Sequence, residues 1–132
     1  MVEFSVMAPV ARVQRQGMLK FSVLRQRAAH AGVMQLGVLD RGAAVKRGAF
    51  LMDMALGQQV KLKVGERLLT APLGMAGVCV GRDAIVGLGV NVAGGRAIPP
   101  GLQITSESDV LIRIPRGLSG RVVVRNGTLE SL

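Results

Sequence analysis

The segment Val80-Gly81-Arg82-Asp83-Ala84-Ile85-Val86-Gly87-Leu88-Gly89-Val90-Asn91-Val92 decides the fold class. Leu88, Val90 and Val92 alternate with Gly89 and Asn91. Such a period of two is typical of a half-buried β-strand. Glycines interrupt the pattern every few residues, and glycine is the residue that most often marks a turn. The segment therefore predicts a mainly β protein made of short strands and tight turns.

The same alternation recurs on both sides of this segment. Three further stretches place aliphatic or aromatic residues at every second position, with polar residues at most positions between them. Strands of this kind bury one side and expose the other. The alternating positions are Val2, Phe4 and Val6, then Val60, Leu62 and Val64, and finally Val110, Ile112 and Ile114.

The end of the sequence predicts a hairpin. Residues 121–125 read Arg-Val-Val-Val-Arg, and Asn126-Gly127 follows directly. Asn-Gly is suited to the positive backbone angles of a two-residue hairpin turn. We therefore expect the valine strand to be followed by an antiparallel partner.

A recurrence of six residues offers an alternative architecture. Aliphatic residues at these steps resemble the hexapeptide repeat of left-handed β-helices. Alternating sequences also generate such steps, because six is a multiple of two. The small residue expected four places on is present as Ala84 but is replaced at Val90, Arg96 and Leu102. We therefore expect a compact β-clip, small barrel or sandwich in preference to a solenoid. The residues in question are Val80, Val86, Val92, Ile98, Ile104 and Val110.

Residues 18–31 carry competing signals. Phe21, Leu24, Ala28 and Ala31 recur near helical spacing, and Gly32 is suited to end a helix. An alternating strand also fits part of the stretch. The sequence therefore leaves a helix and a strand both open for residues 18–31, and it allows a second, shorter helical turn at residues 50–56.

Composition limits the fold and the location of the protein. The chain has 132 residues, of which 49% are hydrophobic, so we expect one domain spanning residues 1–132. It contains no Trp, no Tyr and three Phe, which leaves the core to aliphatic side chains. The start of the sequence lacks the pattern of an export signal, and no apolar stretch suits a membrane span. We expect a location in the cytoplasm or in a virion, and no membrane partner.

The charge is strongly positive and uneven. The net charge is +9, and residues 12–63 contain ten basic residues against two acids. A basic surface of this kind attracts polyanions or an acidic protein partner. Nucleic acid therefore remains an alternative partner, although single-strand binding commonly uses aromatic side chains that this chain largely lacks. The residues predicted to bind a partner or polyanion are Arg12, Arg15, Lys20, Arg25, Arg27, Lys46 and Arg47.

Residues suited to catalysis or metal binding are scarce. The single histidine, His30, lies among alanines, and the single cysteine, Cys79, lies between valines. One His and one Cys far apart in sequence do not make a zinc site or a nucleophile with its base. Glu107 and Asp109 are the one close carboxylate pair, in a polar stretch that reads as a loop. We expect no catalytic residues, no metal and no cofactor.

The segment Ile98-Pro99-Pro100-Gly101-Leu102-Gln103-Ile104-Thr105 resembles the start of SAF domains, the antifreeze-like modules of sialic-acid synthases and flagellar P-ring chaperones. Those domains often carry an acidic residue where this chain has Ser108, with Asp109 one place later. The resemblance implies a β-clip fold and a role as a chaperone or carbohydrate-binding module.

Three other segments are similar to bacteriophage head-decoration, or cement, proteins. They are residues 43–51, residues 76–80 and residues 84–92, in which small residues lead into glycine turns and aliphatic strands. This resemblance implies a compact β fold and docking on a capsid. Together with the scarcity of catalytic residues, it predicts a non-enzymatic assembly protein, a homo-oligomer whose partners are capsid or other assembly subunits. A basic nucleic-acid-binding protein is the alternative.

Overall fold

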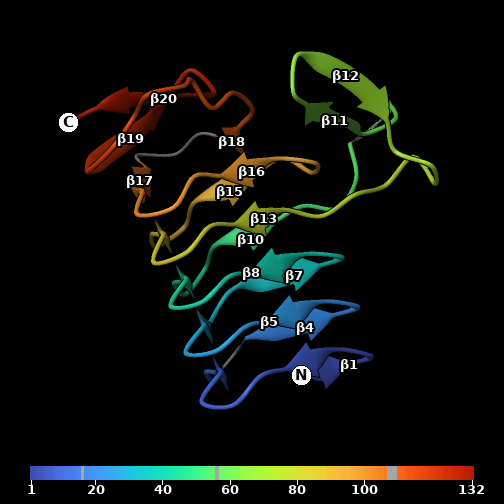
Figure 1. Ribbon diagram of the computed structural model, residues 1–132, viewed down its shortest axis with the longest axis vertical. Coiled ribbons are helices and arrows are strands. Elements are labelled where there is room, and N and C mark those ends of the chain that lie inside the picture. Colours follow the sequence, from blue (N-terminus) through green and yellow to red (C-terminus); the bar gives the residue numbers. More distant parts are fainter. Residues whose placement is uncertain (16, 56, 107–109) are drawn as a thin grey trace.

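Short strands and turns account for the whole described chain. The computed structural model describes residues 1–15, 17–55, 57–106 and 110–132, and it contains no helix within them. No helix there is available to cross a bilayer. Parallel strands stack in coils along one long axis, with the N-terminus at one end and the C-terminus at the other (Figure 1). The fold is a β-solenoid.

Three sheets form the three faces of the solenoid, and the chain visits them in a repeating order. Their strands are parallel except for the antiparallel pair β19–β20 at the end of face C. Face A contains β1 (Val2–Glu3), β4 (Met18–Lys20), β7 (Val33–Gln35), β10 (Phe50–Leu51), β15 (Asn91–Val92) and β18 (Val110–Leu111). Face B contains β2 (Val6–Met7), β5 (Val23–Leu24), β8 (Val38–Leu39), β13 (Cys79–Val80) and β16 (Ala97–Ile98). Face C contains β3 (Arg12–Val13), β6 (Ala29–His30), β9 (Ala44–Val45), β14 (Ile85–Val86), β17 (Gln103–Ser106), β19 (Arg121–Arg125) and β20 (Thr128–Ser131).

The core consists of side chains stacked directly above one another. On face B, for example, Leu24 pairs with Leu39, Leu39 with Val80, and Val80 with Ile98. All four are almost completely buried. Each two-residue strand therefore contributes one inward side chain, which contacts its counterparts in the coils before and after. Such short strands are stable only because the stack buries this continuous column of aliphatic side chains.

The six-residue recurrence describes this stacking. Val80, Val86 and Val92 occupy faces B, C and A in turn, and Ile98 and Ile104 occupy faces B and C of the next coil. Val80 pairs with Ile98, and Val86 with Ile104, eighteen residues on. The solenoid that was the alternative in the sequence is thus the architecture found. The small residue expected four places after each aliphatic residue lies at a corner of the coil. Val90 and Leu102, which replace it in two cases, are buried there as completely as Ala84.

The corner between faces A and B is built from a repeated polar and aromatic pair. The Oγ of Ser5 accepts a hydrogen bond from the backbone N–H of Ser22 (3.1 Å), and the Oγ of Ser22 accepts one from Gly37 (3.1 Å). The rings of Phe4 and Phe21 stack beside them with centroids 5.1 Å apart. Both phenylalanines have positive φ angles, 45° and 47°, which turn the chain from one face to the next.

An insertion of residues 52–78 leaves the solenoid at the same corner. It contains an antiparallel hairpin, β11 (Lys61–Val64) and β12 (Arg67–Thr70), which projects beside the coils that hold β15, β16 and β18 (Figure 1). The chain rejoins face B at Gly77, where a Cβ atom would lie 2.2 Å from the carbonyl oxygen of Leu36. Only glycine fits that close approach without a shift of the backbone.

Several expectations from the sequence are confirmed. The protein is all-β, with short strands around one continuous hydrophobic core. The predicted strand near residues 60–64 is β11, and the closing hairpin is β19–β20, with φ angles of 49° at Asn126 and 73° at Gly127.

Other expectations are wrong. The architecture is a solenoid and not a β-clip, barrel or sandwich. Residues 18–31, for which helix and strand were both open, form β4, β5 and β6, and Phe21 and Arg27 have positive φ values that no α-helix accepts. Phe50–Leu51 is a strand as well, so no helical turn begins there, and residue 56 lies outside the described residues. The strand expected over residues 2–6 is split into β1 and β2 at the corner residue Phe4.

Candidate functional site

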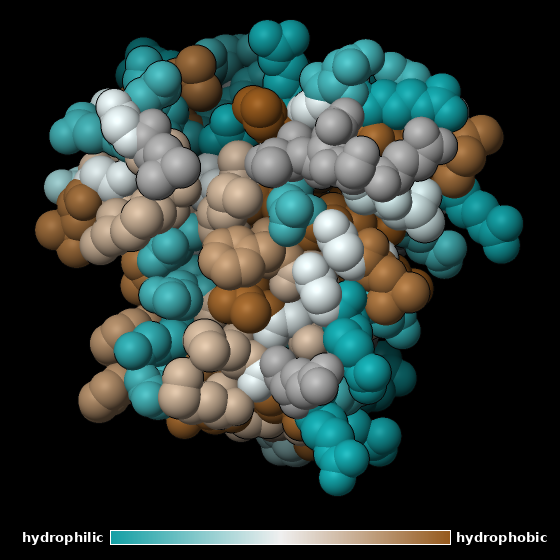
Figure 2. Space-filling view, turned by 180° about the vertical axis from the view of Figure 1, so that it is seen from behind, coloured by the Kyte–Doolittle hydropathy of each residue, from teal (hydrophilic) through white to brown (hydrophobic). Residues whose placement is uncertain are grey.

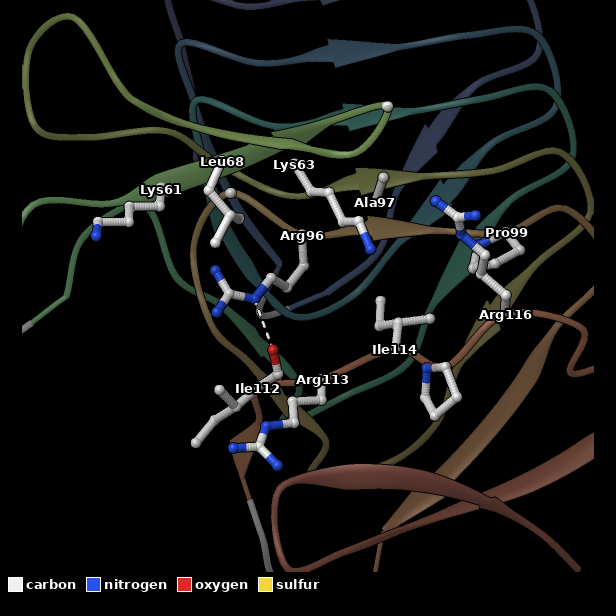
Figure 3. A pocket seen from close by; sticks show the side chains of 13 residues that line it. Lys61, Lys63, Leu68, Arg96, Ala97, Pro99, Ile112, Arg113, Ile114 and Arg116 are labelled. Atoms are coloured by element: carbon white, nitrogen blue, oxygen red, sulfur yellow. Dashed lines mark hydrogen bonds between the residues drawn. The ribbon is translucent and has the colours of Figure 1, made fainter.

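A cavity lies between the projecting hairpin and the last coils of the solenoid. Its volume is about 600 Å³. One wall is the side of the β11–β12 hairpin that carries Lys61, Lys63 and Leu68. The floor is β16 with its flanking residues, and the other wall is the segment of residues 112–116 that follows β18 (Figure 3). We call this cavity the basic groove.

The charged residues described in the lining of the basic groove are all cations. Five of its thirteen described lining residues are basic and none is acidic. Figure 3 shows Lys63 and Ile114 pointing toward one another across β16, while Lys61 and Arg113 extend toward the margin. The basic residues are Lys61, Lys63, Arg96, Arg113 and Arg116.

Hydrogen bonds hold two of these arginines in place. The guanidinium of Arg96 donates from Nε to the carbonyl oxygen of Ile112 (2.7 Å) and from Nη1 to that of Gly94 (2.8 Å). Arg116 forms an ion pair with Glu66 at the tip of the hairpin, which joins the two walls at one end. The positive charge of Arg96 is therefore fixed before any ligand arrives, which lowers the entropic cost of binding an anion.

Apolar side chains lie between the charges. Leu68 and Ile112 are 66% and 50% exposed although both are large and hydrophobic. Together with Ile114, they give the groove an apolar surface within a basic rim. A ligand that complements both the basic rim and the apolar surface would carry negative groups and hydrocarbon side chains along a single extended chain.

The backbone of β16 also faces the groove. β16 is the outermost strand of face B. The carbonyl oxygens of Arg96 and Ile98 accept hydrogen bonds from β13, from Cys79 N–H and Gly81 N–H (2.9 Å each). Because hydrogen-bonding direction alternates along a strand, the N–H and C=O of Ala97 point away from β13, toward the groove.

The basic residues singled out from the sequence do not lie in this groove. Arg12 is on face C, Lys20 is on face A in an ion pair with Glu3 (3.0 Å), and the others lie at two corners of the solenoid. Their binding role stays a prediction. The corner between faces B and C holds Arg25 and Arg27, and the corner between faces C and A holds Arg15, Lys46 and Arg47.

The corner between faces B and C forms a smaller basic site. Arg25, Arg41 and Arg82 come from successive coils and line a cavity of about 240 Å³ with Asp40. The backbone N–H of Arg41 donates to the Asp40 carboxylate (2.7 Å), and this bond, followed by the nearby arginines, lowers the pKa of Asp40. Arg25 also forms an ion pair with Asp40 (2.9 Å), so part of the charge of this corner is neutralised.

The single histidine is a core residue. His30 is fully buried, with Val13 and Val45 as its neighbours on face C. Its Nε2 lies 2.9 Å from the carbonyl oxygen of Met18, and its Nδ1 has no hydrogen-bond partner. Burial lowers the pKa of His30, because the charged imidazolium is poorly solvated there. The neutral ring is inaccessible to a substrate.

The other residues considered for catalysis or metal binding are Cys79 and the acidic residues. Burial raises the pKa of the Cys79 thiol, and Cys79 lies on face B while His30 lies on face C. Among the residues that the structure describes, no group of three or more His, Cys, Asp or Glu side chains is placed to hold a metal ion. Glu107 and Asp109, the carboxylate pair noted in the sequence, lie outside the described residues.

The sequence indicates only some of the basic residues that line the groove. Lys61 and Lys63 alternate in a recognisable strand, but Arg96, Arg113 and Arg116 are isolated among apolar residues and turns. More than thirty residues separate the hairpin lysines from Arg96, so only the folded solenoid brings the two together. In the comparisons with known proteins, no protein-family model and no curated protein matches this chain.

Proposed function

We propose that this protein is a non-enzymatic assembly module whose basic groove docks an extended acidic segment of a protein partner. The observation that supports this most directly is the set of five cations over an apolar surface, with no acid among the described residues of the lining. A segment that alternates carboxylates with hydrocarbon side chains complements such a groove on both counts.

The charges of the groove would attract the segment and orient it. Grouped cations raise the local concentration of an anionic ligand through their summed potential. Arg96 presents a planar guanidinium group, a geometry suited to a carboxylate, whereas Arg116 is already paired with the carboxylate of Glu66. Such contacts weaken as salt screens the charges, so we expect the affinity to fall as ionic strength rises.

An extended conformation of the segment is supported by the edge of β16. The N–H and C=O of Ala97 face the groove, so a segment lying along β16 would add backbone hydrogen bonds to the side-chain contacts. Proteins commonly bind peptides by adding them as a further strand to a sheet edge. Pro99 lacks an N–H, which limits this pairing to the first part of the strand.

The lining favours a protein segment over nucleic acid. Proteins that bind single strands combine cations with aromatic side chains on which the bases stack. None of the three phenylalanines lines the groove. Its apolar residues are aliphatic and suit side chains such as leucine or valine. A capsid subunit, the partner implied by the resemblance to decoration proteins, stays a prediction, as does the virion or cytoplasmic location.

A charge reversal on the hairpin tests the proposal. Lys63 faces the groove, whereas Arg67 lies on the opposite side of the same hairpin, since Arg67 pairs with Val64 and Lys63 with Leu68. Lys63→Glu and Arg67→Glu therefore change the charge equally at two sides of one element. The probe is a fluorescent peptide of alternating Glu and Leu, and its binding is followed by fluorescence anisotropy.

We expect Lys63→Glu to weaken peptide binding by about tenfold, because one attraction is replaced by a repulsion. Arg67→Glu and the double variant Arg25→Glu/Arg27→Glu should bind with nearly the affinity of the unmodified chain. Equal weakening by Lys63→Glu and Arg67→Glu would contradict the assignment to the groove. Tighter binding of random duplex DNA than of the peptide would favour the nucleic-acid alternative instead.

A further inference from the structure

An ion pair already places a carboxylate on one cation of the basic groove. Oε1 of Glu66 contacts Nη2 of Arg116, fifty residues on in the sequence. Glu66 belongs to the hairpin and Arg116 to the opposite wall, and Figure 3 shows the Arg116 side chain extending from residues 112–116 toward the hairpin. Among the described residues, no other cation of the groove forms an ion pair.

The fold positions Glu66 for this contact. Val64 pairs with Arg67, so Gly65 and Glu66 form a two-residue turn at the tip of the β11–β12 hairpin. Gly65 has the positive φ angle (59°) that glycine supplies at the first position of such a turn. Residues 54–82 contain no acid besides Glu66. The hairpin therefore brings a single carboxylate to the end of the basic groove.

The pair is open to exchange with a ligand. The side chains of Arg116 and Glu66 are 71% and 78% exposed. Figure 2 shows hydrophilic side chains at the upper left, where the hairpin projects in this view. Exposed ion pairs are weak, because water solvates both charges and the pairing restricts two long side chains. A carboxylate of another chain can therefore replace that of Glu66 at little cost.

Arg96 differs from Arg116 in what it contacts. Its guanidinium donates to the carbonyl oxygens of Ile112 and Gly94, which carry no net charge. Among the described residues, no carboxylate has to leave Arg96 before a ligand binds. Arg116 is thus the cation of the groove at which binding requires an exchange.

We infer, on the basis of the proposed docking of an acidic segment, that Arg116 is a subsite for a carboxylate of that segment and that Glu66 fills the subsite while the groove is empty. On binding, a ligand carboxylate takes the place of the Glu66 carboxylate at Nη2, and the Glu66 side chain turns into solvent. Because one ion pair is exchanged for another, Glu66 lowers the affinity of the groove. A segment with no carboxylate at this position gains nothing from Arg116, so the subsite selects for an acid there.

This exchange makes the effects of the two residues on affinity depend on one another. With Glu66 present, Arg116 adds little net affinity, because its attraction for the ligand is offset by the loss of the internal pair. In a Glu66→Gln background, the full attraction of Arg116 contributes. If the two charges instead act on the ligand independently through space, their effects on the binding free energy simply add.

Fluorescence anisotropy with the peptide of alternating Glu and Leu, at low salt, measures this dependence. The unmodified chain is compared with Glu66→Gln, Arg116→Gln and the double variant. We expect Glu66→Gln to bind about threefold more tightly than the unmodified chain. Arg116→Gln should weaken binding about threefold in the Glu66→Gln background and by less than about 1.5-fold in the unmodified background.

Glu3→Gln is the matched control. It also removes a paired acid, since Glu3 pairs with Lys20 (3.0 Å), but it lies in the first coil at the opposite end of the solenoid (Figure 1). It should leave the affinity for the peptide unchanged. Glu66 and Arg116 are exposed, so neither substitution disturbs the core, and circular dichroism verifies that each variant is folded.

Three results would overturn the assignment of the subsite. They are equal weakening by Arg116→Gln in both backgrounds, a Glu66→Gln variant that binds no more tightly than the unmodified chain, and equal tightening by Glu66→Gln and Glu3→Gln. The docking of an acidic segment stands in each case, provided that the unmodified chain binds the peptide and Lys63→Glu weakens the binding. If neither the unmodified chain nor Glu66→Gln binds the peptide, the proposed function fails and the subsite with it.

Discussion

The surroundings of the buried His30 predict how its replacement changes the free energy of unfolding. Replacing His30 by valine matches its neighbours Val13 and Val45 in the column of side chains on face C. The change removes the hydrogen bond to the Met18 carbonyl, worth about 1 kcal/mol. It also removes the unpartnered Nδ1, whose burial costs about 1 to 3 kcal/mol. We therefore expect His30→Val to unfold at pH 8 with a free energy equal to or somewhat above that of the unmodified protein.

The free energy of unfolding should also depend on pH through His30. The pKa of His30 is lowered in the folded state below the ordinary value of 6.5, so the unfolded chain binds a proton more readily. The stability linked to His30 is fully present above pH 6.5. As pH falls below 6.5 toward the folded-state pKa, the free energy of unfolding decreases by about 1.4 kcal/mol per pH unit. His30→Val lacks this slope, because His30 is the only histidine in the chain.

Urea denaturation followed by circular dichroism measures both quantities. Titrations at several pH values between 8 and 5 give the free energy of unfolding of each protein, in a range above the pKa of ordinary carboxylates. Equal slopes for the two proteins would mean that His30 does not take up a proton more readily in the unfolded chain. A loss of several kcal/mol in His30→Val at pH 8 would mean that the imidazole is better satisfied in the core than its unpartnered Nδ1 indicates.

Two other predictions concern the stacking of the coils. Cys79 and Ala97 are paired on adjacent strands, which lie about 4.8 Å apart. Ala97→Cys should therefore form a disulfide with Cys79 under mild oxidation, and mass spectrometry would detect it. Leu88→Cys is the control and should form no such disulfide. Failure of the Ala97→Cys pair to cross-link would contradict the register. Leu39→Ala removes a fully buried side chain from face B and should cost about 2 to 5 kcal/mol of unfolding free energy in urea titrations. Leu88→Ala, at a 71% exposed corner position, should change stability by less than about 0.5 kcal/mol; similar losses for both would argue against the column.

The parts of the fold that could be predicted from the sequence are those fixed by neighbouring residues. Asn126-Gly127 specifies its turn locally, and the alternation in β11 needs only its own residues. The six-residue recurrence was visible, but alternation alone generates the same spacing, so the sequence did not distinguish a solenoid from other β folds. The distinction depends on pairing between residues such as Val80 and Ile98, one full coil apart.

The helix-like spacing in residues 18–31 shows why the rest could not be predicted. Leu24 and Ala28 are a strand residue and the buried corner residue four places on, as Val80 and Ala84 are in a later coil. Phe21 adds to the helix-like pattern although it is an exposed corner residue. The groove is hidden for a related reason, because its cations become neighbours only when the insertion folds back beside β16. Local patterns do not encode either contact.

Nuclear magnetic resonance can locate the bound peptide on the protein residue by residue. Titration of the isotope-labelled protein with the peptide of alternating Glu and Leu should shift the backbone amide signals of residues 61–68, 95–98, 112–114 and 116, with Ala97 among the largest changes. Shifts confined to the corner that holds Arg25, Arg41 and Arg82, or no saturable shifts at all, would contradict the account.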